Sequence, residues 1–393
     1  MTNQPSVEKP KDLVVTSPPQ ITGTMSKTRM MTYTFGALMA ITIITAVLWW
    51  PVMTPTEAQI SAMGMTNAIA MPLGAILLLN ALIAVGVAVL SDFVIGKVAA
   101  DSEINTMSAA VFGLIVACCY SIGVPGMAMG MDMTPVDSLM APMCFLYVAI
   151  MSFIGLVVFK KLQGMKGRKF VNPAAAAKFL VLLPTISSIL LVKDHWANFM
   201  EGGLSTPMLA GPIGGGLDAI NGNGAASFST YLQGCYNNPA VMNPPSVESL
   251  MLLVKYHGWP GGASSIAVII VGVALIFLLR NNFKWKITAT YFGSVAVMAL
   301  IMTGIYGGDP MTRLLFELFI GSSIFLGFFM ATDPATTPYT GTGQIIFGIG
   351  LGVLTVIIQT YMNFFGGSLL ALLIMNLTVP LLDRVGIHKP FGR

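Results

Sequence analysis

Two short motifs in this 393-residue chain place a polar residue directly before a proline, Asn172-Pro173 in FVNPAAAAKF and Asp333-Pro334 in FFMATDPATTPYTGTGQ. Asn and Asp are preferred helix caps, and proline suits the first helical position, so each motif predicts the start of a helix. Asp333 also stands among threonines, including Thr336. Such an oxygen-rich break near a membrane edge favours binding of Na⁺ or relay of a proton.

Glu317 and Lys178 are two charged residues that the sequence places inside long apolar segments. A charge in hydrocarbon is expensive, so such residues mark ion or proton pathways by default. The alternative is that each side chain extends its charged end to a nearby membrane surface. We predict an ion path that includes Asp333, Thr336, Glu317 and Lys178, with helix capping and snorkelling as the alternatives.

A third candidate is the stretch GGGLDAINGNGAASFSTYLQG, residues 214–234, which is rich in glycine, asparagine and serine. Its glycines allow the backbone to approach a phosphate closely, and Phe228 and Tyr231 can stack on a ring. The alternative is a flexible connection, because a lone Gly-x-Gly with no preceding strand is a weak nucleotide-binding signal.

The composition sets the class of protein that must position these residues. Hydrophobic residues make up 55% of the chain and charged residues only 9%, against about 25% charged in soluble domains. This indicates a polytopic integral membrane protein. The net charge of +4 is small and gives no reason to expect a nucleic-acid partner.

Long apolar runs without alternation favour helices over barrel strands. We predict about ten transmembrane helices, each long enough to cross roughly 30 Å of hydrocarbon. The predicted segments are 31–52, 68–90, 106–122, 138–159, 172–192, 265–280, 287–306, 314–331, 343–360 and 362–382.

The basic residues predict the orientation. With the N-terminus in the cytoplasm, sixteen Lys and Arg residues fall on the inside, and only Lys193, Lys255 and Arg313 fall outside. The positive-inside rule therefore predicts a multi-pass protein of the cytoplasmic membrane with both termini in the cytoplasm. The polar residues 1–30 then form a cytoplasmic tail rather than a signal peptide.

A long loop divides the chain. We expect a first five-helix half at 31–192, an extracytoplasmic loop at 193–264, a second five-helix half at 265–385 and a cytoplasmic tail at 386–393. Because five is odd, two related halves would be inverted relative to one another. The internal similarity of AAVFGLIVA and IIFGIGLGVL is faint enough to arise by chance.

The cysteines and histidines do not predict a metal site. Cys118 and Cys119 are adjacent, so they point about 100° apart on a helix, and we expect them to be small buried hydrophobic residues. No Cys-x-x-Cys pair and no His-x-x-His spacing occurs.

Several segments resemble the RnfD component of the Rnf ion-translocating electron-transport complex and, more distantly, the NqrB component of the Na⁺-pumping NADH:quinone reductase. The segments are LVVTSPPQ, KKLQGMKGRKFVNPAAAAKFLVLL, WPGGASSIAVIIVGVALIFLLRNNFKWKI, FFMATDPATTPYTGTGQIIFGIGLGVLTVII and GGSLLALLIMNLTVPLLDR. The resemblance implies a urea-channel-like fold of ten spans in two inverted halves. It also implies a flavin-carrying subunit of a redox-driven Na⁺ or H⁺ pump.

In the family, FMN is joined by a phosphoester to a threonine in a Ser-Gly-Ala-Thr motif of the long extracytoplasmic loop. The overlay puts Ala226 at the threonine position, and alanine has no hydroxyl to esterify. Ser227 or Thr230 can replace it, the flavin can bind non-covalently, or it can be absent. The cofactor-binding residues implied by this overlay are Asp218, Asn221, Asn223, Gly224, Ser227, Phe228 and Thr230. The family's glutamate before the sixth span is also replaced, with Ala263 in that region.

The resemblance therefore implies a subunit of an ion-translocating oxidoreductase that relays electrons through FMN or a related flavin and is not catalytic alone. Its partners would be the other membrane and peripheral subunits, the lipid bilayer, and Na⁺ or H⁺. The alternatives are a flavin-free scaffold subunit of the same complex and a solute channel or transporter of the same fold.

The replacement at Ala226 generates a prediction about flavin attachment. If a covalent FMN is present, denatured protein will carry the mass of an FMN phosphoester, and Ser227→Ala or Thr230→Ala will remove it. Mass spectrometry of the peptide spanning 214–234 checks this. An adduct that survives both substitutions contradicts both assignments, and free flavin released on denaturation indicates non-covalent binding.

Overall fold

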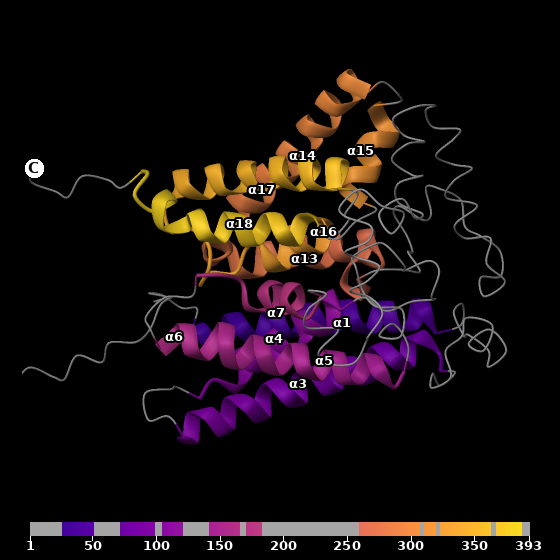
Figure 1. Ribbon diagram of the computed structural model, residues 1–393, viewed down its shortest axis with the longest axis vertical. Coiled ribbons are helices and arrows are strands. Elements are labelled where there is room, and N and C mark those ends of the chain that lie inside the picture. The colour runs from indigo at the N-terminus through magenta and orange to yellow at the C-terminus, as the bar shows by residue number, and fades with distance from the viewer. Residues whose placement is uncertain are drawn as a thin grey trace, which may run out of the picture.

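The computed structural model describes residues 26–50, 71–98, 104–120, 141–165, 170–182, 259–306, 310–319, 323–362 and 367–386. Throughout these ranges the regular secondary structure is helical, and none of them contains a strand. The all-α class predicted from the long apolar runs is confirmed there. In Figure 1 most of the helices run across the view, whereas α14 and α15 rise steeply from the others.

The first group of helices lies N-terminal to the long gap at residues 183–258. Its fourth member is continuous, because α5 runs through the π-helical η2 into α6. The elements are α1 (Lys27–Trp49), α3 (Leu73–Val98), α4 (Thr106–Cys119), α5 (Met143–Ile154), η2 (Gly155–Leu162), α6 (Gln163–Met165) and α7 (Pro173–Leu182).

The second group follows the gap and includes a second π-helical segment, η6. The elements are η4 (Pro260–Gly262), α13 (Ser265–Leu279), η5 (Arg280–Asn282), α14 (Trp285–Tyr306), α15 (Pro310–Phe319), α16 (Ser323–Phe325), η6 (Leu326–Met330), α17 (Gly341–Met362) and α18 (Gly367–Leu382).

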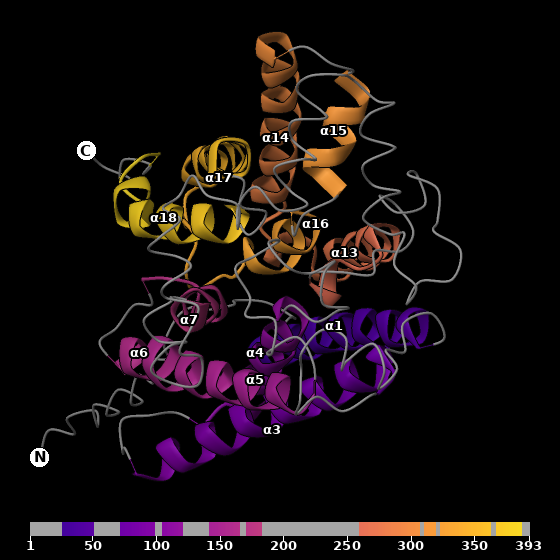
Figure 2. The same cartoon turned by 45° about the vertical axis from the view of Figure 1, so that its right-hand side comes forward.

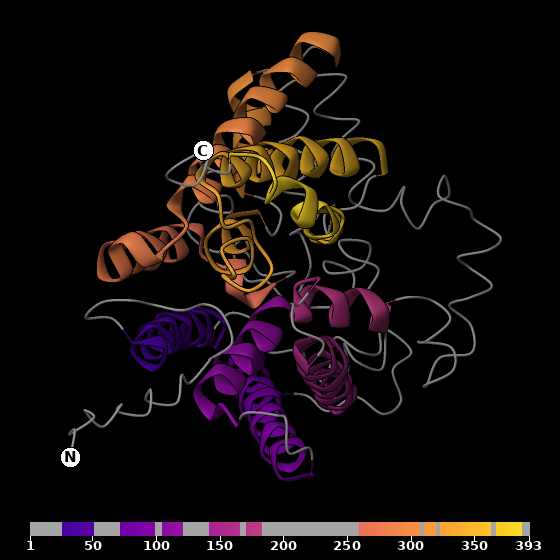
Figure 3. The same ribbon diagram turned by 90° about the vertical axis from the view of Figure 1, so that its left-hand side faces the viewer.

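The two groups form two bodies that pack against one another, indigo to magenta and orange to yellow in Figures 2 and 3. At their boundary α7 contacts α18, α4 contacts η4, and α1 contacts both α13 and η4. The aromatic residues Trp259, Phe325 and Phe329 are buried in this region. Trp259 meets Phe325 edge-on, with ring centroids 6.4 Å apart, and Phe325 stacks on Phe329 at 5.3 Å.

Polar caps explain where several helices begin. Ser26 accepts a hydrogen bond from the Arg29 N–H and caps α1, which begins at Lys27, four residues before the predicted start at residue 31. Asn105 and Ser264 cap α4 and α13 in the same way. These side chains replace backbone partners that the first turn of a helix lacks.

The described helices confirm the membrane class but not the full span count. Five helices are long and apolar enough to cross a membrane, at Lys27–Trp49, Leu73–Val98, Met143–Leu162, Trp285–Ile305 and Gly341–Gln359. The bent pair Arg313–Phe319 and Ser323–Met330 makes a sixth if it is one span. The apolar helices α4, α13 and α18 are shorter, at 10–17 residues. The ten-span arrangement therefore stays a prediction.

Glycines allow a close helix crossing between α14 and α17. A Cβ atom at Gly352 would lie 2.8 Å from the Tyr291 carbonyl oxygen, and one at Gly348 would lie 2.7 Å from the Ile287 carbonyl oxygen. Because these two glycines are four residues apart, they occupy one face of α17. Small residues at this spacing let membrane helices approach at backbone distance, where packing rather than the hydrophobic effect holds them together.

This crossing generates a stability prediction. Gly352→Ala should lower the free energy of unfolding by about 1–3 kcal/mol, because the added methyl group overpacks against a backbone carbonyl that cannot move aside. Thermal unfolding in detergent, followed with a thiol-reactive dye on the buried cysteines, measures the change. Gly293→Ala is the matched control, since a Cβ there meets nothing within 4 Å. Equal melting temperatures for the two variants would contradict the close crossing.

Candidate functional site

Lys178 is a buried cation at the boundary between the two helix groups. Its side chain is 2% exposed, and Nζ donates to the Cys119 carbonyl oxygen at 2.6 Å. The same nitrogen lies 4.3 Å from the centroid of the Trp259 ring, within range of a cation–π contact. The snorkelling alternative is therefore wrong for Lys178, because its charge is held inside the protein by groups from α4 and from the start of the second group.

Asn172 confirms its predicted role as the cap of α7. Its Oδ1 accepts from the N–H groups of Ala174 and Ala175 at 3.1 and 3.2 Å. Its Nδ2 donates to the Met330 carbonyl oxygen, 3.2 Å away at the end of η6. One buried amide therefore both starts a helix of the first group and attaches it to the second.

The backbone of Asp333 is hydrogen-bonded to the same carbonyl oxygen. Its backbone N–H donates to the Met330 oxygen at 3.4 Å, so the Asn-Pro and Asp-Pro motifs converge on one acceptor although 161 positions separate them. The expectation that Asp333 caps a helix is wrong. Its Oδ1 accepts from the Ala335 N–H within a turn, and α17 begins only at Gly341, where the Thr340 hydroxyl accepts from the Gly343 N–H.

The turn after Asp333 is held by hydroxyl groups and a lysine. Asp333 Oδ2 accepts from the hydroxyl of Thr336, which is 1% exposed. The hydroxyl of Thr337 donates to the Asp333 carbonyl oxygen at 2.6 Å. Lys284 from the start of α14 donates to the Thr337 hydroxyl at 2.6 Å and to the Pro334 carbonyl at 3.3 Å. The Lys284 ammonium group therefore lies against the oxygen-rich break.

Glu317 lies in α15 and is 1% exposed, so the snorkelling alternative is also wrong for this residue. Arg313, one turn earlier on the same helix, is equally buried, and its Nη1 donates to the Met302 carbonyl oxygen at 3.4 Å. The sequence places Arg313 in an outside loop, just before the predicted span 314–331. In the structure the helix begins earlier, at Pro310, and carries both charges into the protein.

An ion pair that was not predicted from the sequence is buried in the first group. Asp92 is 1% exposed, its Oδ1 lies 2.6 Å from Lys161 Nζ, and its Oδ2 accepts from the Asn105 N–H. The predicted span ends at residue 90, whereas α3 continues to Val98. The run of apolar residues beyond Asp92, with Phe93, Val94 and Ile95 following, was the available signal.

The structure brings some of the predicted ion-path residues together and separates others. Asp333 and Thr336 share a hydrogen bond, and Asn172 joins them to α7. Lys178 lies six residues further along α7, about 9 Å at the helical rise. Glu317 lies on a different element, α15, and takes no part in the hydrogen bonds described for Asp333 and Lys178. The seven proposed flavin-binding residues all lie outside the described ranges.

Cys118 and Cys119 are fully buried, as expected for small hydrophobic residues. Cys118 Sγ lies 3.4 Å from the hydroxyl of Thr42 on α1. A Cβ at Gly261 would approach Cys118 Cβ to 2.9 Å, so this cysteine lies directly against η4. Ala263 is likewise buried.

Comparison with known proteins finds one family. The model of the NQR2, RnfD, RnfE family matches residues 137–392. The chain is 29% identical, over 62% of its length and 68% of the relative's, to the D-type subunit of a proton-translocating ferredoxin:NAD⁺ oxidoreductase complex of Clostridium ljungdahlii. It is 27% identical, over 61% and 65%, to the same subunit of the Na⁺-translocating counterpart of Acetobacterium woodii. It is 26% identical, over 80% and 86%, to the D-type subunit of an ion-translocating oxidoreductase complex of Shewanella sediminis.

The environment of Lys178 predicts how substitutions there affect stability. Lys178→Ala should cost about 2–5 kcal/mol, because it leaves a cavity and strips the Cys119 carbonyl of a donor. Lys178→Met should cost less, since a hydrophobic residue of similar volume replaces a buried charge. Lys97→Ala is the control, because Lys97 is exposed although its Nζ lies 4.4 Å from the Phe93 ring centroid. Thermal unfolding orders the three variants, and a loss in Lys97→Ala as large as in Lys178→Ala would contradict the burial argument.

Proposed function

Because the chain belongs to the NQR2, RnfD, RnfE family, we propose that it is a membrane subunit of a redox-driven complex that translocates Na⁺ or H⁺. It acts within the complex as part of an oxidoreductase and is not catalytic alone. Its named relatives are subunits of ion-translocating ferredoxin:NAD⁺ oxidoreductase complexes. Oxidation of the electron donor takes place on partner subunits, which this chain anchors in the bilayer.

The observation that carries this proposal is the concentration of buried charge among apolar helices. Asp92, Lys178, Arg313 and Glu317 are each no more than 2% exposed. Buried charges rarely increase stability over well-packed hydrophobic residues, so their presence in a membrane protein favours a role in ion movement. A scaffold would have no such need for a cation at the boundary of its two helix groups.

For the ion path we propose the junction of Asn172, Met330, Asp333 and Thr336, continued along α7 to Lys178. The Asp333 carboxylate retains lone pairs beyond its bonds to Ala335 and Thr336, and it is partly exposed at the end of the bundle. It can therefore receive an ion or a proton from water. The neighbouring Lys284 repels cations from one side and thereby directs them to the other.

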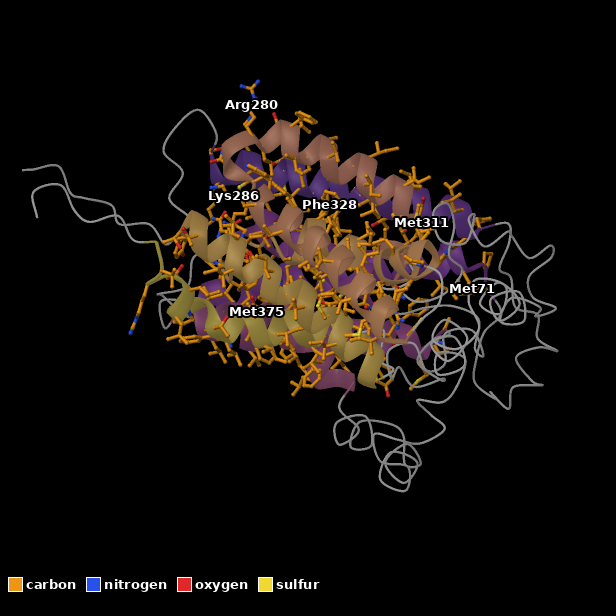
Figure 4. All side chains as sticks on the ribbon, turned by 90° about the horizontal axis from the view of Figure 1, so that it is seen from above. Met71, Arg280, Lys286, Met311, Phe328 and Met375 are labelled. Atoms are coloured by element: carbon orange, nitrogen blue, oxygen red, sulfur yellow. The ribbon has the colours of Figure 1, made fainter. Side chains whose placement is uncertain are left out.

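For the topology we propose ten spans in two inverted five-helix halves, with both termini in the cytoplasm and residues 193–264 outside. Figure 4 supports the alternation of direction. Arg280 at the end of α13 and Lys286 at the start of α14 lie at one end of the bundle, and Met71 and Met311 lie at the other. Basic residues at the first end are those that the positive-inside rule places in the cytoplasm.

For the cofactor we propose a flavin held by the segment 214–234, as the resemblance implies. A flavin transfers one or two electrons, which suits a relay between partner subunits. The replacement of the usual threonine by Ala226 favours a second candidate, a flavin-free membrane scaffold of the same complex. Flavin content of the purified subunit separates the two.

Asp333→Asn tests the proposed ion path. In the purified complex reconstituted into vesicles, it should slow ion uptake by about tenfold or more, because the amide removes the charge that attracts the ion. Assembly should be retained, since an amide oxygen still accepts from the Ala335 N–H. Redox turnover and ion uptake are measured on the same vesicles, so that uncoupling is distinguished from loss of the complex.

Two threonines provide a matched pair for this experiment. Thr336→Val removes the hydroxyl bonded to Asp333, whereas Thr332→Val removes one that donates to the Phe328 carbonyl of the preceding π-helical segment η6. The first should slow uptake and the second should not. Normal uptake by both Asp333→Asn and Thr336→Val would show that the turn is purely structural.

A further inference from the structure

The ammonium group of Lys284 lies among oxygen atoms of the segment between η6 and α17. Its Nζ is 2.6 Å from the Thr337 hydroxyl oxygen, 3.1 Å from the Thr337 carbonyl oxygen and 3.3 Å from the Pro334 carbonyl oxygen. The Tyr339 ring lies on a further side, with its centroid 5.2 Å from Nζ. Three oxygen atoms and an aromatic face therefore converge on one positive charge.

These oxygen atoms belong to a part of the chain that is not helical. η6 ends at Met330 and α17 begins at Gly341, so Pro334 and Thr337 lie between two helical segments. In many transporters, backbone carbonyl oxygens of unwound segments coordinate cations. Carbonyl and hydroxyl oxygens are also the ligands that hard cations prefer. The oxygen atoms around Lys284 therefore have the composition of a cation site, and a lysine occupies it.

Contacts that do not involve Lys284 hold these oxygen atoms in place. The Thr337 hydroxyl donates to the Asp333 carbonyl oxygen at 2.6 Å, so its lone pairs are left for the site. Thr337 itself is fully buried. The Tyr339 N–H donates to Asp383 Oδ1 at 2.8 Å, which attaches the segment to the end of α18. The oxygen atoms therefore stay together when the lysine leaves them.

The position of Lys284 allows its side chain to leave. Lys284 directly precedes Trp285, the first residue of α14, and the positive end of a helix disfavours a cation. The ammonium group is carried on a flexible four-carbon stem. Lys284 is partly exposed and Tyr339 is 50% exposed, so the site borders on solvent at this side. The same opening admits an ion.

Two positive charges cannot share so small a group of oxygen atoms, because they repel one another strongly at such a distance. We propose that the ammonium group of Lys284 and a free Na⁺ ion compete for the oxygen atoms of Pro334 and Thr337. The lysine is a tethered cation that closes the site until an ion displaces it. The inference rests on the proposed function, since this segment carries Asp333 of the proposed ion path. It adds to that function the group that controls entry of the ion.

The chemical reactivity of the Lys284 amine tests the competition in the intact purified complex. An amine-acetylating reagent is applied while NaCl replaces choline chloride at constant ionic strength, and mass spectrometry of the peptides gives the rate at each lysine. The rate at Lys284 should rise several-fold and in a saturable manner, because the displaced amine enters water. Lys286 is the internal control, since its Nζ lies against Gly341 rather than among these oxygen atoms, and its rate should not change. A rate at Lys284 that is independent of Na⁺ overturns the competition.

Removal of the tethered cation gives a second test. In choline chloride, the Lys284→Ala complex should melt at a lower temperature than the wild type, and Na⁺ should restore the loss in a saturable manner by filling the vacated oxygen atoms. Adding Thr337→Val should raise the apparent dissociation constant for Na⁺ by about tenfold. Lys286→Ala is the matched control, because it removes the same charge two residues further along, and Na⁺ should not restore its stability.

The outcomes of this second test are decisive in either direction. A recovery by Na⁺ that is equal with and without Thr337→Val overturns the site, as does an equal recovery in Lys286→Ala. If the Lys284→Ala complex dissociates in choline chloride, its survival in NaCl becomes the measurement. Loss of this complex at every salt composition also overturns the site.

Failure of this inference and failure of the proposed function give different results. A complex whose redox turnover drives ion uptake, while the reactivity of Lys284 is independent of Na⁺, overturns the competition and leaves the proposed function intact. A complex whose redox turnover drives no ion movement overturns the proposed function. Reactivity of Lys284 that still depends on Na⁺ in such a complex supports the cation site alone.

Discussion

A charge buried in a membrane protein has no water to solvate it, so other protein groups must do so. For the Lys178 ammonium group, the Cys119 carbonyl oxygen is one such group. Cys119 is the last residue of α4. The ring of Trp259, from the second helix group, covers the other side of the ammonium group. This one cation of α7 therefore contacts both α4 and the residue that precedes η4.

Side chains also donate hydrogen bonds to backbone carbonyl oxygens at places where the chain leaves regular helix. The Met330 carbonyl oxygen at the end of η6 accepts from Asn172 of the first group and from the Asp333 backbone. The carbonyl oxygens of Pro334 and Thr337 accept from Lys284. Helix ends have carbonyl oxygens without intrahelical partners, and in this protein side chains from neighbouring helices supply the missing donors. Side chains from one helix group thereby satisfy backbone carbonyl oxygens where neighbouring helices end.

Between these polar points the helices are held by close packing. Gly348 and Gly352 allow α17 to meet α14 at backbone distance, and Gly113 lets α4 approach the Ala84 carbonyl of α3 in the same way. Such crossings have little freedom to slide, because the contact is between rigid backbones. They therefore fix the relative heights of side chains on different helices.

The sequence by itself determined the membrane class, the approximate helices, the capping by Asn172 and the resemblance that family membership confirmed, because each of these depends on local pattern. It could not place Asp92 or Arg313, since a charged residue near the end of an apolar run is read as the boundary of a span. Only the tertiary structure decided that Lys178 and Glu317 are sealed from water, and that two proline motifs share the Met330 carbonyl. The reason is physical: whether a charge is solvated depends on the neighbours that pack around it, and those neighbours come from distant parts of the chain.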